Sequence, residues 1–224
     1  MFMNNLTSGL FDKKIERVIK IHYILTIFIR ITLILAFIGA IYNQRWIVLF
    51  AVILTFILTF LPKLFERRYK IYLPVEFEIL IIIFLYSTLF LGEVHGYYDK
   101  FWWWDFVLHT SSALAFGFIG FMILYILYKG NKVIANPFWI AVFSFCFALA
   151  IGTIWEIFEF NMDQIFGFNM QKSGLIDTMW DLIVDSIGAF IASILGYFYI
   201  KKREIFLFGK VFRRFELENP NFFK

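Results

Sequence analysis

The stretch DFVLHTSSALAFGFIGFMILYILY, residues 105–128, decides the fold class because it is long and apolar enough to cross a bilayer as a single helix. A transmembrane helix needs about 20 mostly apolar residues to cross roughly 30 Å of hydrocarbon. Segments of similar length and apolarity recur on both sides of this stretch. The sequence therefore predicts an all-α, polytopic membrane protein.

Six apolar segments of this kind are expected to span the membrane as one bundle. They cover residues 22–42, 46–62, 74–92, 105–128, 137–159 and 178–200. Pro74 and Pro137 stand at the start of the third and fifth segments, where a helix tolerates proline. No linker or repeat divides the chain, so we expect a single transmembrane domain over residues 1–224.

The composition excludes a soluble protein. Charged residues make up 17% of the chain and hydrophobic residues 61%, whereas soluble domains carry about 25% charged residues. The single cysteine, Cys146, excludes a disulfide framework. The basic residues lie almost entirely in the connections between apolar segments, a pattern that reports orientation and predicts no nucleic-acid partner.

The distribution of basic residues predicts the orientation in the membrane. Seventeen lysines and arginines lie in the termini and in the connections near residues 63–71 and 129–136, against three in the other connections. Positive charge accumulates on the cytoplasmic side of membrane proteins, so both termini are expected in the cytoplasm. Residues 201–224 mix basic and apolar side chains, which predicts an interfacial tail on the anionic inner leaflet.

Ionisable residues inside spans are costly and therefore candidates for function. Arg30 in the first span and Glu78 in the third lie at comparable depth. A structural ion pair between them is the simplest explanation, with snorkelling of the arginine as the alternative.

The last three spans concentrate acidic residues at their expected outer ends. The i,i+3 and i,i+4 spacings place the residues of each span on one helix face, and the alternating topology brings the three faces to the outer side. The residues are Asp105 and His109, Glu156 and Glu159, and Asp177, Asp181 and Asp185.

Six carboxylates beside one imidazole at a low-dielectric boundary must hold protons, exclude some members from the cluster, or bind a cation. This ligand chemistry suits a divalent ion such as Zn²⁺, Mg²⁺, Mn²⁺ or Fe²⁺. The predicted catalytic residues are Glu159, as a general base, and Asp177. The predicted metal ligands are Asp105, His109, Glu156, Asp181 and Asp185. Helix capping is the competing explanation for Asp105, Asp177 and Asp181.

The connections around this acidic cluster supply two further features. Trp102, Trp103 and Trp104 form an aromatic belt at the outer interface, or one wall of a pocket for a lipid. The connection over residues 160–176 is a candidate lid over the same opening.

Three motifs carry a resemblance to a known family. WDFVLHTSSALAFGFIG (104–120), GTIWEIFEF (152–160) and DTMWDLIVDSIGA (177–189) resemble the YjdF-type bacterial membrane proteins and, more loosely, VanZ-like proteins. The resemblance covers about residues 90–200. It implies a bacterial plasma-membrane location and a shared set of acidic and histidine positions, and it implies no reaction because the family has no established one.

Three functional hypotheses follow from these features. The first is a metal-dependent hydrolase or transferase acting on a membrane lipid or an envelope precursor. The second is a cation- or proton-coupled transporter that uses the same carboxylates. The third is a non-catalytic accessory membrane protein in which the polar residues pack helices.

Overall fold

The computed structural model describes residues 2–202 and 208–223, and in this range the chain is helical and contains no strand. Six helical segments are long and apolar enough to span a membrane, which confirms the predicted all-α polytopic class. They are Glu16–Tyr42, Val48–Tyr69, Val75–Val94, Trp104–Lys129, Pro137–Phe166 and Leu175–Lys201. The cytoplasmic position of both termini stays a prediction.

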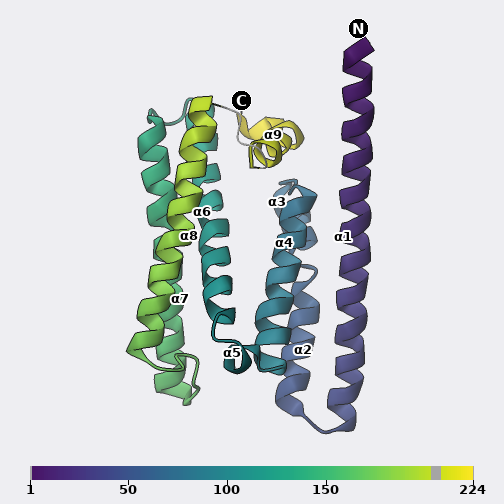
Figure 1. Cartoon of the computed structure of the whole chain (residues 1–224), viewed down its shortest axis with the longest axis vertical. Helices are drawn as coiled ribbons and strands as arrows, with labels where there is room; N and C mark the ends of the chain where they lie inside the picture. The colour runs from purple at the N-terminus through teal and green to yellow at the C-terminus, as the bar shows by residue number, and fades with distance from the viewer. Residues whose placement is uncertain (1, 203–207, 224) are drawn as a thin grey trace. The chain divides into compact units, whose positions relative to one another are not determined.

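The chain forms two compact units, Met1–Lys100 and Phe101–Lys224, and each is described by itself. The single transmembrane domain over residues 1–224 stays a prediction. The first unit contains six helical elements (Figure 1). They are α1 (Phe2–Tyr42), α2 (Trp46–Leu58), α3 (Leu61–Tyr69), α4 (Val75–Leu85), the π-helix η1 (Tyr86–Val94) and α5 (Tyr97–Lys100). Its core is built from α1, α2, α4 and η1 through Ile29, Leu33, Val52, Ile82 and Phe90.

The predicted pairing of Arg30 with Glu78 is wrong. Arg30 donates from Nε to Thr59 Oγ1 at 3.2 Å and from Nη2 to the Thr59 carbonyl at 3.4 Å. Its guanidinium also lies 3.9 Å from the centre of the Phe60 ring. The break between α2 and α3 supplies these partners, while Glu78 instead faces His22, with Oε2 3.5 Å from Nε2.

The second unit is built on three long helices that pack against one another. They are α6 (Trp104–Lys129), α7 (Pro137–Phe166) and α8 (Leu175–Lys202), followed by α9 (Phe208–Glu218) and the 3₁₀-helix η2 (Pro220–Phe223). The chain runs up, down and up through α6, α7 and α8. The starts of α6 and α8 and the end of α7 therefore lie together, at the lower end in Figure 1.

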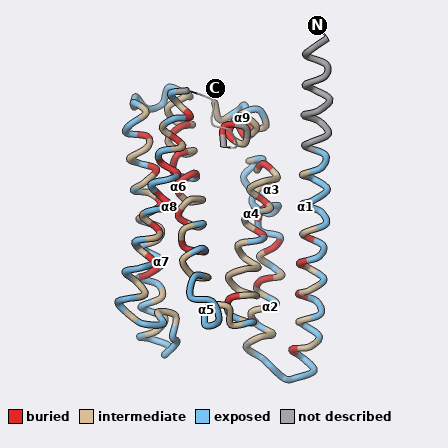
Figure 2. Tube along the Cα trace, viewed as in Figure 1, coloured by how far each residue is buried: buried red, intermediate tan, exposed pale blue. Residues whose placement is uncertain are grey.

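Small residues let α6 and α8 approach closely. A methyl group added at Gly117 would meet the Cβ of Ala192, and one at Gly188 would meet the Thr110 carbonyl and lie 3.1 Å from the Cβ of Ala113. In a membrane, helices associate through such close packing rather than through exclusion of water. Buried residues recur along both helices, where they are red in Figure 2.

The tail that follows α8 is packed in part rather than free. The predicted interfacial tail includes residues 203–207, which lie outside the described residues. In α9, Phe212 is only 2% exposed and joins a core with Phe118 and Phe121, and Tyr125 donates to Glu216 at 2.6 Å. Phe212 therefore packs against α6, and the interfacial position of the tail as a whole stays a prediction.

Candidate functional site

Helix α6 and helix α8 bring a histidine and three aspartates together inside the second unit. Asp105 lies in the first turn of α6, and His109 lies one turn further on the same face. The Oδ1 atom of Asp105 lies 3.7 Å from His109 Nε2, and the Oδ1 atom of Asp185 lies 3.4 Å from His109 Nδ1. The imidazole is thus placed between two carboxylates from different helices.

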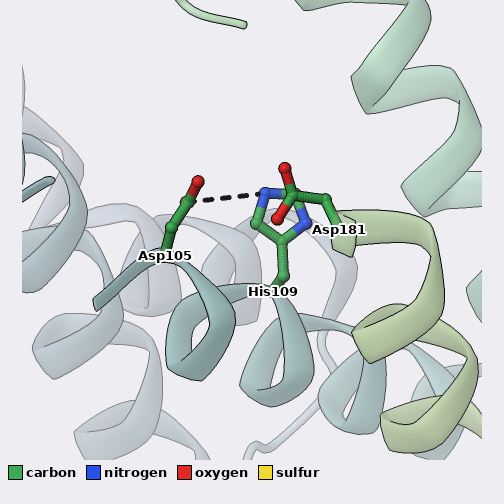
Figure 3. Close-up of side chains that lie close together, drawn as sticks. All are labelled: Asp105, His109 and Asp181. Atoms are coloured by element: carbon green, nitrogen blue, oxygen red, sulfur yellow. Dashed lines mark ion pairs between the residues drawn. The ribbon is translucent and has the colours of Figure 1, made fainter. Parts of the chain in front are cut away.

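Asp105, His109 and Asp181 form a group that could hold a metal ion. One ligand atom of each residue lies within 4.8 Å of the ligand atoms of the other two. The three side chains converge from α6 and α8 (Figure 3). The sequence predicted all three residues as ligands. They meet because α6 and α8 both begin at the same end of the second unit, as the alternating direction of the spans predicted.

Glu156 and Asp185, the other two predicted ligands, are buried beside this group but are not part of it. Glu156 is 4% exposed and Asp185 is 1% exposed. His109, Asp177 and Asp185 are among the charged groups that act on the Glu156 carboxylate. Both carboxyl groups therefore belong to the buried surroundings of the imidazole.

Glu159 and Asp177, the predicted catalytic residues, are half-buried, as Asp105 is, whereas Asp181 is fully buried. Glu159 accepts a hydrogen bond from Trp155 Nε1 at 2.9 Å, one turn earlier on α7. Asp177 lies in the first turn of α8, and Asp105 and His109 are among the charged groups that act on it. Both carboxylates thus belong to the surroundings of the site.

The position of Glu156 and Glu159 within α7 differs from the prediction. The apolar segment was expected to end at residue 159, which placed both glutamates at a helix C-terminus. Helix α7 instead continues to Phe166, so the glutamates lie about two to three turns before its end. The unfavourable effect of the helix macrodipole on an acidic side chain is confined to the last turn, so it acts little on these two glutamates.

Burial leaves the carboxylate of Asp181 without a compensating partner. Among the described residues, both of its oxygens are buried and accept no hydrogen bond, whereas Asp185 Oδ1 faces His109 Nδ1 at 3.4 Å. A buried charge without a partner is strongly unfavourable, and proteins normally pair it or use it to coordinate a metal. Capping also fails as an explanation for Asp181, because a capping carboxylate would accept a backbone N–H.

The connection after α7 is ordered by hydrogen bonds near the site. Asp163 accepts the backbone N–H groups of Met170 at 2.7 Å and Gln171 at 2.9 Å. The Gln171 side chain donates to Thr178 Oγ1 at 2.7 Å, next to Asp177 in the first turn of α8. The candidate lid is thus shorter than predicted and is tied to both flanking helices.

Aromatic side chains flank the same helix ends. The Phe106 ring lies 5.9 Å from the Trp180 ring and 6.0 Å from the Trp102 ring, measured between centroids. Phe106 follows Asp105 in the sequence, and Trp180 precedes Asp181. These rings therefore connect α6 and α8 beside the candidate metal group.

Two features of the structure were missed by sequence reasoning. Gly152 of α7 faces Asp185, and a methyl group added there would collide with Asp185 Oδ2. A glycine inside a helical pattern often indicates close packing. The sequence could therefore have predicted a close contact at Gly152, although not that Asp185 makes it. The second feature is the His22–Glu78 pair of the first unit. His22 lies at the start of its predicted span, where a histidine gives no signal of a buried partner.

Comparisons with known proteins identify the family of the chain. Residues 21–202 match the family described as "Predicted membrane protein (DUF2238)". An uncharacterized protein of Thermotoga maritima is 32% identical over 116 residues, which is 51% of this chain and 57% of that relative. No solved structure matches. These findings confirm the expected membership of a membrane-protein family without an established activity, and the chain belongs to the DUF2238 family of predicted membrane proteins.

Proposed function

We propose that this protein is a metal-dependent hydrolase or transferase that acts on a membrane lipid or an envelope precursor. In this proposal a divalent ion binds between Asp105, His109 and Asp181. The observation that carries it is the burial of Asp181, which is 1% exposed and has no hydrogen-bond partner for either oxygen among the described residues. A bound cation would offset the cost of burying this carboxylate.

The ligand set favours a catalytic rather than a structural ion. Two carboxylates and one imidazole suit hard or borderline ions, namely Mg²⁺, Mn²⁺, Zn²⁺ or Fe²⁺. Structural zinc sites usually have four protein ligands, whereas catalytic sites have three and keep a position for water or substrate. An ion at such a site polarises a carbonyl or phosphoryl oxygen or activates water as a nucleophile.

The surroundings of the group support a substrate that is partly in the lipid. Asp105 lies in the first turn of a membrane-spanning helix. Trp102 and Trp180 lie beside it and are exposed. Tryptophan is enriched at the depth of the lipid headgroups. A phosphorylated headgroup would complement the divalent ion. Glu159 and Asp177, at the edge of the group, are the proposed acid–base residues.

The family and its relative also support a location in a bacterial plasma membrane. The match to a predicted membrane-protein family and the six apolar helices make the chain a multi-pass membrane protein. The relative from Thermotoga maritima favours the bacterial assignment. We place the metal group on the outer side, from the distribution of basic residues in the sequence.

Metal content of the purified protein tests the proposal. We expect about one divalent ion for each chain after incubation with Zn²⁺, Mn²⁺, Mg²⁺ or Fe²⁺, measured by elemental analysis with calorimetric titration. The variant Asp181→Asn should abolish this ion binding. Asp163→Asn is the matched control, because Asp163 is an acidic residue of the same unit that binds backbone N–H groups instead. Wild-type protein that binds none of the four ions would refute the proposal.

One observation favours the transporter alternative. Glu78 is 7% exposed and faces His22 inside the first unit, so buried ionisable groups are present in both halves of the chain. Buried carboxylate and histidine residues within spans are typical of proton and ion pathways. Proteoliposome uptake of cations or protons that disappears in Glu78→Gln would support this alternative over the enzyme, and absence of uptake would count against it.

A further inference from the structure

We propose that Asp185 is the positioning residue of this site, which holds the His109 imidazole so that Nε2 is directed at the metal ion. The inference rests on the proposed metal group of Asp105, His109 and Asp181. It assigns Asp185 a different role from the direct ligand that the sequence predicted.

The two nitrogens of the imidazole have different neighbours. Nε2 faces Asp105, a member of the metal group, at 3.7 Å. Nδ1 faces Asp185 at 3.4 Å, on the other side of the ring. A well-formed N–H···O bond measures about 2.7–3.2 Å, and such contacts often shorten when the ligand of the site binds. The ring is therefore oriented with Nε2 toward the metal group and Nδ1 toward Asp185.

The Asp185 carboxylate is fixed on a second side by α7. Its Oδ2 atom packs against Gly152, at a point where any Cβ atom would collide with it. The side chain is 1% exposed, so water does not compete for it. Asp185 on α8 thus contacts α6 through His109 and α7 through Gly152, and its position depends on all three helices.

This arrangement has a known chemical effect in metal sites. A histidine ligand usually donates its second ring N–H to a carboxylate, which fixes the tautomer and the ring orientation and raises the basicity of the other nitrogen. A hydrogen bond from Nδ1–H to the Asp185 carboxylate would be charge-assisted, and such bonds are about twice as strong as neutral ones. Asp185 would act on the ion through His109.

A measurement on metal-free protein tests the orientation directly. The chain contains three histidines, so ¹⁵N-labelling of histidine followed by proton NMR in bicelles can resolve the His109 Nδ1–H signal. This proton is present in both the imidazolium form and the Nδ1–H neutral form. We expect a downfield, slowly exchanging signal that Asp185→Asn shifts upfield or broadens and that Asp181→Asn retains. A signal unchanged in Asp185→Asn would overturn the inference.

A second measurement separates a positioning residue from a ligand. With Co²⁺ as the probe, Asp185→Asn should weaken binding by about 10–100-fold and leave the d–d absorption spectrum of the bound ion unchanged. Asp181→Asn should abolish binding or change the spectrum. An equal spectral change in both variants would make Asp185 a ligand and refute the assignment.

The two measurements distinguish failure of this inference from failure of the proposed function. If wild-type protein binds no divalent ion, the metal site fails, and the NMR experiment still decides whether Asp185 orients His109. If Asp185→Asn does not fold, Gly152→Ala replaces it, because the added methyl group displaces the carboxylate without removing its charge. The His109 signal should then move in the same direction.

Discussion

Replacing Gly152 with alanine should damage the site without changing any polar residue. Glycine in a helix interior is less stable than alanine by about 0.5–1 kcal/mol, so the substitution would normally stabilise α7. At this position the new methyl group collides with Asp185 Oδ2. Either Asp185 leaves its rotamer and loses His109, or α7 and α8 separate.

Gly39→Ala is the control because a methyl group at Gly39, in the last turn of α1, meets no atom within 4 Å. Gly39→Ala should therefore gain up to about 1 kcal/mol. Overpacking of a tightly packed site costs about 1–3 kcal/mol. The overpacking cost is the expected difference in unfolding free energy between the two variants, and it corresponds to several degrees in Tm for a chain of this size.

The assay is reversible unfolding in mixed micelles, followed by circular dichroism, together with Co²⁺ affinity. A double-mutant cycle adds the variant Asp185→Ala, in which the methyl group has space. In that background Gly152→Ala should behave like Gly39→Ala. The reasoning is refuted if Gly152→Ala is as stabilising as Gly39→Ala in the wild-type background and leaves Co²⁺ affinity unchanged.

Three further predictions concern the packing, the connection and the metal group. Phe212→Ala should lower the unfolding free energy by about 3–5 kcal/mol, because Phe212 is buried in the core of the second unit; a change near zero in the same unfolding assay would instead indicate a tail at the membrane surface. Asp163→Ala should increase hydrogen exchange at the Met170 and Gln171 amides, whose acceptor it removes, and unchanged protection would contradict the role of Asp163. Lowering the pH should weaken divalent-ion binding, since protons compete for carboxylate and imidazole ligands. Calorimetric titration across a pH series should show this decline, and pH-independent binding would point to other ligands.

The membrane class and the meeting of α6 and α8 were predictable from the sequence. Long apolar segments predict the membrane spans. Helical spacing predicts which polar residues at the end of a span share one helix face. Alternation of direction then brings Asp105, His109 and Asp181 to one end of the unit. These inferences need only helix geometry and topology.

The roles within the cluster were not predictable, because they depend on side-chain rotamers and on contacts between helices. Asp185 and Asp181 lie on one face of α8 with the same spacing from each other as two ligands would have. Only the structure places Asp185 on Nδ1 of His109 and Asp181 in the metal group. Similarly, equal depth suggested Glu78 for Arg30, whereas the helix break at Thr59 offered nearer acceptors.

The end of α7 shows a further limit of hydropathy. The apolar pattern stops at Phe160, and polar residues follow in Asn161, Asp163 and Gln164. These polar side chains can extend into water while the backbone stays helical. A change from apolar to polar residues therefore marks the end of the apolar span and not the end of the helix. The helix ends at Phe166, and the residue that caps it, Gly167, has a left-handed φ of 68°.

The contact between Gly152 and Asp185 also has a consequence for how this family changes over time. A larger residue at position 152 is compatible with the packing only if the side chain at position 185 becomes shorter or is lost. The two positions should therefore vary together among relatives, and lineages that keep the aspartate should keep the glycine. A relative with a bulky residue at position 152 is then expected to have given up the His109 contact, and with it the chemistry of the site.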